Sequence, residues 1–282
     1  MKPRPALVIH GGTGTRPARR RVAQIRRHLR TLAAEMYDRL GCESALETVA
    51  FAVQRLEDDP LFNAGTGSAI QRDGHVRMSA SIMDGARRRF AGVLNIERIR
   101  HPIRVAQLLM DDEDRLLAGA GAFRFARSRG CAPWNPITAA RHRQWEHRRA
   151  EPSYGTVGAV ALDGDGRLAA ATSTGGKGFE RVGRVSDSGL PAGNYATTEV
   201  AISCTGHGED IVEEALAARI AQRVLDGHPL RRAFAHIFRE LTTRHRRAGA
   251  IGIDRHGRWT WATTLPIVFA VAQSRAGHVE SF

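Results

Sequence analysis

The sequence predicts an α+β protein, in which strands and helices come in separate runs. Apolar, β-prone segments and amphipathic segments each occur in groups, whereas a doubly wound parallel sheet would need strands and helices to alternate regularly. Short segments of small, β-prone residues joined by tight turns are concentrated in the second half of the chain. A length of 282 residues, 42% of them hydrophobic, is enough for a substantial core and fits one large domain or two small ones.

The N-terminal region is predicted to begin with a buried strand, Ala6 to His10, that ends in a tight turn at Gly11 to Gly14. These glycines lack the full GxGxxG spacing of a dinucleotide site, so we interpret them as turn residues. Apolar residues then recur at helical spacing over Arg19 to Leu40 and over Glu43 to Leu56, which predicts two amphipathic helices. Pro60 to Gly67 has the composition of a turn.

The middle of the chain is predicted to hold a hairpin, two helices and a linker. Ser68 to Met83 alternates around Arg72-Asp73-Gly74, which is typical of a hairpin. Ile103 to Met110 and Arg115 to Arg127 have helical spacing. Cys131 to Tyr154 is aperiodic and rich in Pro, Trp, His and Arg, so we interpret it as the linker.

The second half of the chain is predicted to form two strand pairs with helices between them. Its segments are small and β-prone strands at Thr156 to Leu162 and Leu168 to Ser173 joined by the turn Asp163 to Gly166, helices at Glu209 to Leu225 and Leu230 to Arg244, and strands at Ala250 to Asp254 and Trp259 to Thr264. A central strand is therefore expected to begin almost at Thr156.

Composition excludes several classes of protein. Cys42, Cys131 and Cys204 are too few and too scattered for a disulfide framework, and there is no CxxC pair for a zinc site. Met1 to Ala6 has neither the apolar region nor the cleavage site of a secretory signal. No run approaches 18 apolar residues, so no spanning helix and no membrane partner are expected, and the cytoplasm is the expected location.

A formal charge of +13 is a reason to consider nucleic-acid binding, since clustered arginines attract phosphate. The excess is spread over Arg16 to Arg30, Arg87 to Arg89, Arg141 to Arg149 and Arg244 to Arg247. No nucleic-acid motif and no interleaved aromatic residues accompany these runs. We therefore interpret them as a solvated surface and expect no nucleic-acid partner.

The segment with the strongest chemical signal starts at Gly155-Thr156, where a threonine lies between the linker and a buried strand. Alone, such a threonine is usually just a β-branched strand residue. More hydroxyls and glycines are expected at other strand ends, in the segments Thr172 to Gly176, Arg184 to Ser188 and Ser203 to Glu209. Small hydroxyl groups are therefore expected to converge with Thr156.

These segments, together with Leu56 to Gly67 and Met83 to Gly85, resemble the plant-type L-asparaginase and isoaspartyl peptidase family of N-terminal nucleophile hydrolases. The resemblance runs along most of the chain in the family's order. It implies a four-layer αββα sandwich, made as a single domain spanning 1–282. It also implies self-cleavage between Gly155 and Thr156 into an α subunit, 1–155, and a β subunit, 156–282, which assemble as a dimer of cleaved protomers.

In the implied self-cleavage, a single threonine, Thr156, starts the reaction. The Thr156 hydroxyl attacks the carbonyl of Gly155, whose lack of a side chain permits the strained backbone that this acyl shift requires. Hydrolysis of the ester then frees the α-amine of Thr156. Its reference pKa of about 7.7 to 8.0 suits it to act as the general base for its own hydroxyl, without a histidine.

The resemblance also assigns roles to residues around the nucleophile. Thr174 is similar to the hydroxyl that orients the nucleophile, and Thr205 with the amide of Gly206 is similar to the oxyanion donors. Asn63 is similar to the supporting amide. The implied reaction is hydrolysis of asparagine and of β-aspartyl dipeptides, both small molecules, at the aspartyl side-chain carbonyl.

Three further residues are similar to the family's substrate-binding groups. Arg184 corresponds to the guanidinium that binds the α-carboxylate in a forked pair, and Asp187 with the carbonyl of Gly208 corresponds to the acceptors of the α-ammonium. With both charges of an aspartyl unit held, its side-chain carbonyl reaches Thr156.

No catalytic cofactor is implied, but a structural sodium ion is. The loop Leu56 to Thr66 is similar to the family's sodium loop. Its ligands there would be the backbone carbonyls of Leu56, Glu57, Asp59, Phe62, Ala64 and Thr66.

The sequence departs from the family pattern at several places, none of which is a proposed catalytic residue. Ser186 replaces a usual glycine, Thr13 replaces a usual alanine, and the loop Gly189 to Tyr195 is shorter than usual. Arg87 to Val93 is condensed, and the linker Cys131 to Tyr154 is short. Pocket shape and the rate of self-cleavage are therefore expected to differ from the family's.

Structural interpretations of the same residues stay open. Arg184 and Asp187 taken alone could form a surface ion pair, and Asn63 and Thr205 could be turn and cap residues. Two histidines, His10 and His207, are expected to be structural, since the mechanism needs no imidazole.

Three other functions compete with the leading one. A glycosylasparaginase normally has an aspartate before the nucleophile, where this chain has Gly155, and is normally secreted with disulfides. A basic nucleic-acid-binding module is the second alternative, and a family member inactivated by changes such as Ser186 is the third. The preferred leaving group does not follow from the sequence.

Overall fold

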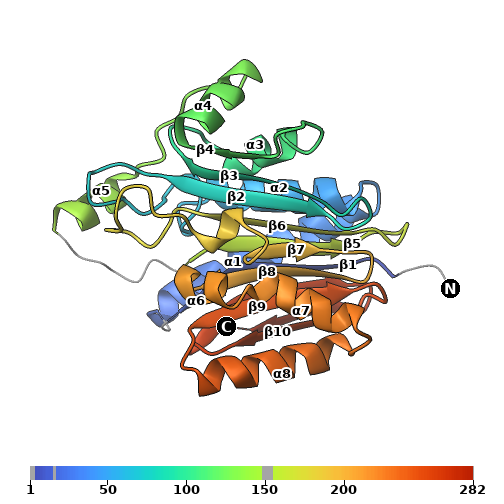
Figure 1. The fold of residues 1–282 in the computed structure, drawn as a ribbon. Coiled ribbons are helices and arrows are strands. Elements are labelled where there is room, and N and C mark those ends of the chain that lie inside the picture. Colours follow the sequence, from blue (N-terminus) through green and yellow to red (C-terminus); the bar gives the residue numbers. More distant parts are fainter. Residues whose placement is uncertain (1–3, 15–16, 148–154, 282) are drawn as a thin grey trace.

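The protein folds into two β-sheets with helices on their outer faces (Figure 1). The structure, a computed structural model, describes residues 4–14, 17–147 and 155–281. The first three residues, Thr15 and Arg16, the end of the predicted linker at 148–154, and Phe282 lie outside the described residues. No helix in the described ranges is long and apolar enough to cross a membrane.

Within the described residues the large sheet has eight strands, antiparallel except for its last pair, β3 and β4. Their order across the sheet is β12 (Gly277–Ser281), β11 (Ile267–Ser274), β1 (Ala6–Gly14), β5 (Val157–Leu162), β6 (Leu168–Thr174), β2 (Met78–Asp84), β3 (Arg89–Ile96) and β4 (Leu116–Ala118). The strand after Thr156, β5, is therefore central in the sheet, with β1 on one side and β6 on the other.

The small sheet has four antiparallel strands in the part of the chain that the structure describes. Their order is β10 (Trp259–Thr263), β9 (Ala248–Asp254), β8 (Val200–Gly206) and β7 (Asn194–Ala196). Strands β8 and β9 face β1, β5 and β6 of the large sheet, so the two sheets pack against each other.

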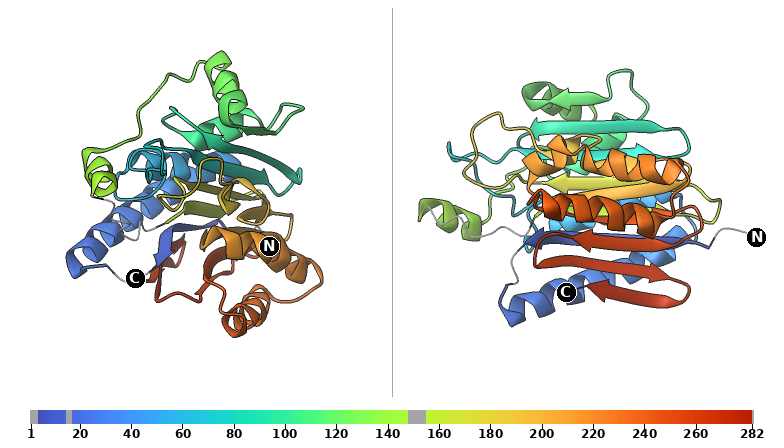
Figure 2. Two further views of the ribbon diagram at one scale, coloured as in Figure 1. Left: turned by 60° about the vertical axis from the view of Figure 1, so that its left-hand side comes forward. Right: turned by 60° about the horizontal axis from the view of Figure 1, so that its bottom comes forward.

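Helices cover the outer faces of the sheets (Figure 2). Those on the large sheet are α1 (Arg19–Leu40), α2 (Ala45–Asp58), α3 (Pro102–Leu108) and α4 (Gly119–Ser128), and those on the small sheet are α7 (Leu216–Leu225) and α8 (Leu230–Thr243). Shorter elements are α5 (Ala139–Glu146), the 3-10 turn η1 (Asp187–Gly189) and α6 (Gly208–Glu213).

Local sequence explains where these helices lie. In α1 the residues at helical spacing, among them Ile25, Leu29 and Met36, are fully buried against the large sheet. Helix α2 begins at a capping box, in which Ser44 accepts from the amide of Glu47 and the Glu47 carboxylate accepts from Ser44. Two unpaired helix amides are satisfied in this way.

Alternation along the strands separates three cores. On β5, Val157, Ala159 and Ala161 pack against the helices of the large sheet. Val160 and Leu162 point the other way, into the core between the two sheets. A third core joins the small sheet to α7 and α8.

The prediction of a mixed fold with grouped strands and helices is confirmed, and several segments match. Helix α1 has the predicted bounds, α2, α3 and α8 lie within a few residues of theirs, and the strand pairs β5–β6 and β9–β10 form as expected. Strands β11 and β12 were not anticipated individually, yet β11 borders β1.

Five local predictions were wrong. Gly11 to Gly14 is not a turn, because β1 continues through it with an irregularity between His10 and Thr13. A side chain at Gly11 would collide with the Phe62 ring at 2.5 Å, so close packing explains this glycine. The hairpin over Ser68 to Met83 is also wrong: only its end is strand, β2, and β2 pairs with β3.

The remaining corrections concern helices. The predicted helix Glu209 to Leu225 is interrupted at Ala215, which has a left-handed backbone with φ +44°. The predicted helix Arg115 to Arg127 begins instead with the short strand β4. The predicted linker contains α5, whose N-cap Thr138 accepts from the amide of Arg141.

Candidate active site

Strand alternation aims three threonines into the space between the sheets. Thr156 has the same parity as Val160 and Leu162, which lie in the core between the sheets. Thr174 at the end of β6 has the parity of Leu168 and Ala170, in that same core. On β8, Thr205 has the parity of Ala201, which faces the large sheet.

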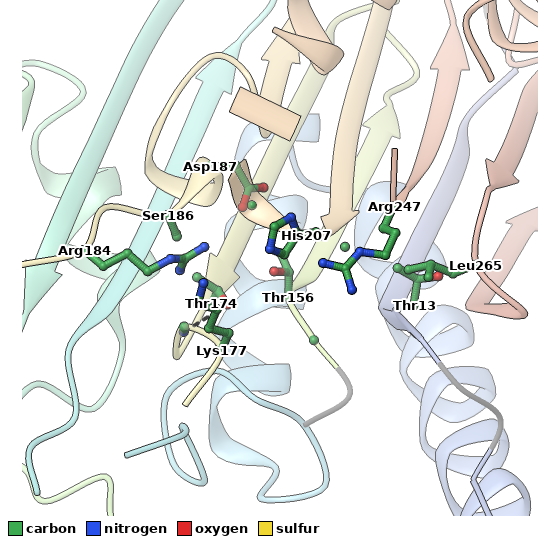
Figure 3. Close-up of a pocket in the computed structure, with 14 residues that line it drawn as sticks. Thr13, Thr156, Thr174, Lys177, Arg184, Ser186, Asp187, His207, Arg247 and Leu265 are labelled. Carbon is green, nitrogen blue, oxygen red and sulfur yellow. Dashed lines mark hydrogen bonds between the residues drawn. The ribbon is translucent and has the colours of Figure 1, made fainter. Parts of the chain in front are cut away.

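Thr156 and Thr174 line one cavity of about 310 Å³ at the end of the sheets (Figure 3), whereas Thr205 is fully buried behind Gly155 and does not line it. Residues expected from the sequence line it: Gly155, Thr156, Thr174, Arg184, Asp187, Gly206 and Gly208. In the picture Arg184 and Asp187 lie to one side of Thr156, and Arg247, Thr13 and Leu265 lie to the other.

The Thr156 hydroxyl is nearly buried, with 5% of the residue exposed. Ser188 donates to it across 3.5 Å. The Thr205 hydroxyl lies 3.2 Å from the position that a side chain on Gly155 would take, and it has no hydrogen-bond partner among the described residues. A buried hydroxyl without a partner is costly unless a ligand or reacting group uses it.

Two glycines of the cavity cannot carry a side chain. Gly206 has φ +137°, and a Cβ there would lie 2.7 Å from the carbonyl oxygen of Arg247. A Cβ on Gly208 would lie 2.6 Å from Nη2 of Arg184 and 2.9 Å from Oδ1 of Asp187. The backbone therefore approaches both charged groups closely.

Asn63 does not line the cavity but holds one of its walls. Its Nδ2 donates to the carbonyl of Gly176, and its Oδ1 accepts from the amide of Ala69 at 2.8 Å. The amide of Gly176 donates to the hydroxyl of Thr174 at 3.3 Å. Asn63 thus fixes the loop that follows Thr174.

Arg184 forms an ion pair, although not with Asp187. Its Nε and Nη2 donate to the two carboxylate oxygens of Glu209 at 2.8 and 3.0 Å, and only 13% of its side chain is exposed. Burial opposes the charged guanidinium, but Glu209 outweighs it, so the pKa of Arg184 is raised. The hydrogen bond from Arg184 holds the pKa of Glu209 well below its usual range.

Asp187 is a buried acid in η1 with little compensation. Burial raises its pKa to about 7, although the charge of Arg184 opposes that shift. Its Oδ2 has no hydrogen-bond partner in the described chain. This oxygen is buried beside Gly193, whereas Oδ1 lies beside Gly208 on the cavity side, so a cationic ligand would approach the carboxylate at Oδ1.

Beneath Thr156, a buried polar chain joins the two sheets. His10 on β1 contacts the Ser203 hydroxyl at 2.8 Å, and Ser203 on β8 contacts the Thr172 hydroxyl at 2.7 Å. Burial lowers the pKa of His10 to about 3, with the Thr156 backbone opposing that shift. His10 is therefore neutral at physiological pH, in keeping with the structural role expected for it.

The segment Leu56 to Thr66, expected to bind sodium, spans the last residues of α2 and a compact turn that follows the helix. Phe62 and Ala64 are fully buried in it, and Gly65 has φ +53°. A Cβ on Gly65 would lie 2.3 Å from the Glu57 carbonyl oxygen, which also accepts from the amide of Thr66 at 2.7 Å. A carbonyl oxygen has two lone pairs, so this bond leaves one free. Within the described ranges no cluster of His, Cys, Asp or Glu suits a metal.

Sequence reasoning missed four residues that complete the site. Ser188 contacts Thr156, Glu209 pairs with Arg184, and Lys177 donates to Glu209 at 3.1 Å. Arg247 lines the far side of the cavity. Glu209 and Ser188 lie in segments that the sequence singled out for chemistry, and Arg247 lies in the basic run Arg244 to Arg247, which was interpreted as a solvated surface. Lys177 lies in a loop whose sequence carries no signal.

Comparison with known proteins places the chain in a family. The family described as Asparaginase matches the chain over residues 3–280. The chain belongs to this asparaginase family.

Curated relatives cover most of this chain. A protein of Synechocystis sp. named isoaspartyl peptidase/L-asparaginase is 44% identical over 285 residues, covering 94% of this chain and 87% of its own. A protein of Nostoc sp. with the same name is 44% identical, covering 94% and 91%. A plant-type L-asparaginase of Pyrococcus abyssi is 35% identical and covers 88% of each chain.

Proposed function

We propose that this protein hydrolyses L-asparagine and β-aspartyl dipeptides at the aspartyl side-chain carbonyl, after cutting its own chain before Thr156. The proposal rests on family membership and on the names of relatives that match nearly the whole chain. One geometric observation carries it further: the unpartnered hydroxyl of Thr205 lies beside Gly155, where the first oxyanion would form.

In the proposed self-cleavage, Thr156 Oγ1 attacks the Gly155 carbonyl carbon, and the peptide nitrogen takes up the hydroxyl proton as the bond breaks. The Thr205 hydroxyl would donate to the oxyanion, together with the amide of Gly206. Water then hydrolyses the ester, leaving a carboxylate on Gly155 and a free amine on Thr156.

In turnover, the same groups would act on substrate. The amine of Thr156 accepts the hydroxyl proton, Oγ1 attacks the side-chain carbonyl, and the leaving amine departs with a proton. Thr174 and Ser188 would orient the hydroxyl. Water then releases aspartate from the acyl-enzyme.

Arg184 and Asp187 would bind the charged α-amino and α-carboxylate groups of the substrate. Arg184 is held in place by Glu209 and keeps its remaining N–H groups for the α-carboxylate. The Asp187 carboxylate, with Oδ1 beside Gly208, suits an α-ammonium, whose charge would supply the compensation that burial otherwise denies it. Asparagine and a β-aspartyl dipeptide carry both groups and the same side-chain carbonyl.

The assembly that we propose is the one that the family resemblance implies. We propose a single domain in which helices, sheet, sheet and helices form a four-layer sandwich, cleaved into 1–155 and 156–282, with two cleaved protomers in a dimer. The separate helix-facing cores and the core between the sheets support the four layers.

We further propose that the loop Leu56 to Thr66 binds a structural sodium ion through backbone carbonyls. The tight contact of Gly65 with the Glu57 carbonyl supports it, since a side chain at Gly65 would fill the turn. A bound sodium ion would use the free lone pair of the Glu57 carbonyl oxygen together with the other backbone carbonyls named above. Thermal unfolding should then occur at a higher temperature in sodium chloride than in tetramethylammonium chloride of equal strength, and identical midpoints would contradict the site.

The mass of the purified protein tests the main proposal. We expect two fragments, the second beginning at Thr156, with release of ammonia from asparagine and of free aspartate from a β-aspartyl dipeptide. Thr156→Ala should stay as one chain and lose activity by about four to six orders of magnitude, as when a nucleophile is removed from other hydrolases. An intact wild-type chain with full activity would show that the mechanism is wrong.

A further inference from the structure

The cavity has cationic groups on both sides of Thr156, and the reaction described above uses only one side. Arg184 and Asp187 form the proposed clamp, the pair that would bind the α-carboxylate and α-ammonium of the aspartyl unit. Arg247, between α8 and β9, lies on the opposite side, with Thr13 and Leu265 beside it (Figure 3). Its position calls for a separate explanation.

The backbone of Arg247 is held firmly beside the proposed oxyanion donors. Its carbonyl accepts from the amide of His207 at 2.8 Å, and its own amide donates to Oδ2 of Asp210 at 2.9 Å. Gly206 packs so closely that a Cβ there would meet this carbonyl at 2.7 Å. The guanidinium therefore extends from a fixed point.

The guanidinium itself is nearly uncompensated. Its nearest ion-pair contact among the described residues is Asp210 at 4.0 Å, and 61% of the side chain is exposed. The neighbouring Arg246 instead takes Oδ1 of Asp210 at 3.2 Å and Glu213 at 2.7 Å. Arg247 thus keeps its donors for a ligand, whereas the charge of Arg246 is already balanced.

Substrate chemistry indicates what this ligand is. With the aspartyl α-groups at Arg184 and Asp187 and the carbonyl at Thr156, the leaving amine must point away from that clamp, toward Arg247. In a β-aspartyl dipeptide this amine carries an α-carboxylate one carbon further on. Guanidinium groups bind carboxylates through paired hydrogen bonds.

We infer that Arg247 binds the α-carboxylate of the leaving amino acid and so favours β-aspartyl dipeptides over L-asparagine. The inference rests on the proposed function. Asparagine loses ammonia, which has no carboxylate, so it gains nothing from this contact. Arg247 is then a specificity-determining residue, distinct from the groups that bind the aspartyl unit.

Three substrates test the inference: β-aspartyl-alanine, its C-terminal amide, and L-asparagine, each measured with the matured enzyme. The wild type should prefer the free acid to the amide. Arg247→Ala should lower kcat/KM for the acid, relative to asparagine, by about 10- to 100-fold, the range for a charged hydrogen bond. It should also erase the preference for the acid over the amide, and Arg247→Lys should restore part of it.

Arg232→Ala is the matched control, because it removes one exposed arginine of α8 that makes no ion pair in the described chain. It should change none of the three ratios. An equal loss on all three substrates in Arg247→Ala, or no loss on any, would overturn the inference while leaving the proposed function standing. A matured wild type that cleaves neither asparagine nor the dipeptide would overturn both.

Discussion

The two sheets contribute to the cavity in different ways. The large sheet supplies Thr156 and Thr174 from strands joined by a tight turn, and its register places Val157 opposite Ser173, so the neighbouring threonines follow directly. The small sheet supplies Thr205 and Gly206 from β8, which no short connection ties to β5. Their approach to Thr156 depends on how the sheets pack.

The difference separates two requirements of the proposed reaction. Orientation of the nucleophile is a local property of one hairpin, which forms from adjacent sequence. Stabilisation of the oxyanion is a tertiary property, because Thr205 must reach across the gap to Gly155. Changes to the small sheet should therefore damage charge stabilisation while leaving the nucleophile in place.

The sharpest test of this separation is Thr205→Val, which keeps the shape of the side chain and removes the hydroxyl. We expect self-cleavage and turnover to slow by about 10²- to 10³-fold each, as when one oxyanion donor is lost. The cleavage rate is measured by mass over time, and kcat is measured on the cleaved fraction. Thr205→Ser should keep most of both rates. A Thr205→Val enzyme with normal kcat would show that Thr205 does not stabilise the oxyanion.

A second test concerns charge on the clamp side. The pKa of Asp187 is raised to about 7 by burial, so its ionised fraction falls about tenfold per pH unit below that value. Only the ionised form can accept an α-ammonium. Between pH 7 and pH 5, kcat/KM for asparagine should therefore fall faster than kcat/KM for succinamic acid, which lacks the α-amine.

The ratio of the two substrates cancels the titration of the Thr156 amine, because both need that base. The ratio should fall about tenfold per pH unit in the wild type and stay low and flat in Asp187→Asn. A wild-type ratio that does not change between pH 5 and pH 7 would contradict the role proposed for Asp187.

The sequence predicted the local features well because local patterns determine them. Helix α1 matches its predicted bounds, since its apolar spacing is uninterrupted, and the turn Asp163 to Gly166 correctly joined β5 to β6. The predicted hairpin over Ser68 to Met83 failed even though its turn exists, with the amide of Gln71 bonded to the carbonyl of His75. The residues before that turn are held by Asn63 and not by a partner strand.

The candidate site likewise has features that local sequence predicts and features that depend on tertiary packing. Most residues named from motifs line the cavity, Asn63 supports one of its walls, and Thr205 is buried behind Gly155; their roles stay predictions. The pairing of Arg184 with Glu209, and the presence of Arg247, depend on which loops the packing brings together. No sequence spacing encodes those contacts.

The smallest effect should appear in the polar chain that joins the sheets. Ser203→Ala removes the partner of both His10 and Thr172, leaving buried polar groups unsatisfied, and should lower the free energy of unfolding by about 1 to 3 kcal/mol. Thr172→Val keeps the contact between His10 and Ser203, so its loss should be smaller. Both are measured as midpoints of thermal unfolding, which shift by about 2 to 4 °C per kcal/mol for proteins near this size.

Ser128→Ala, at an exposed serine bonded only to its own helix, is the control for that comparison and should barely move the midpoint. If Ser203→Ala were as harmless as this control, the chain from His10 to Thr172 would not stabilise the packing of the sheets. The placement of Thr205 opposite Gly155 would then depend on the apolar core between the sheets alone, and replacing Val160 or Ala201 would become the change that disturbs it.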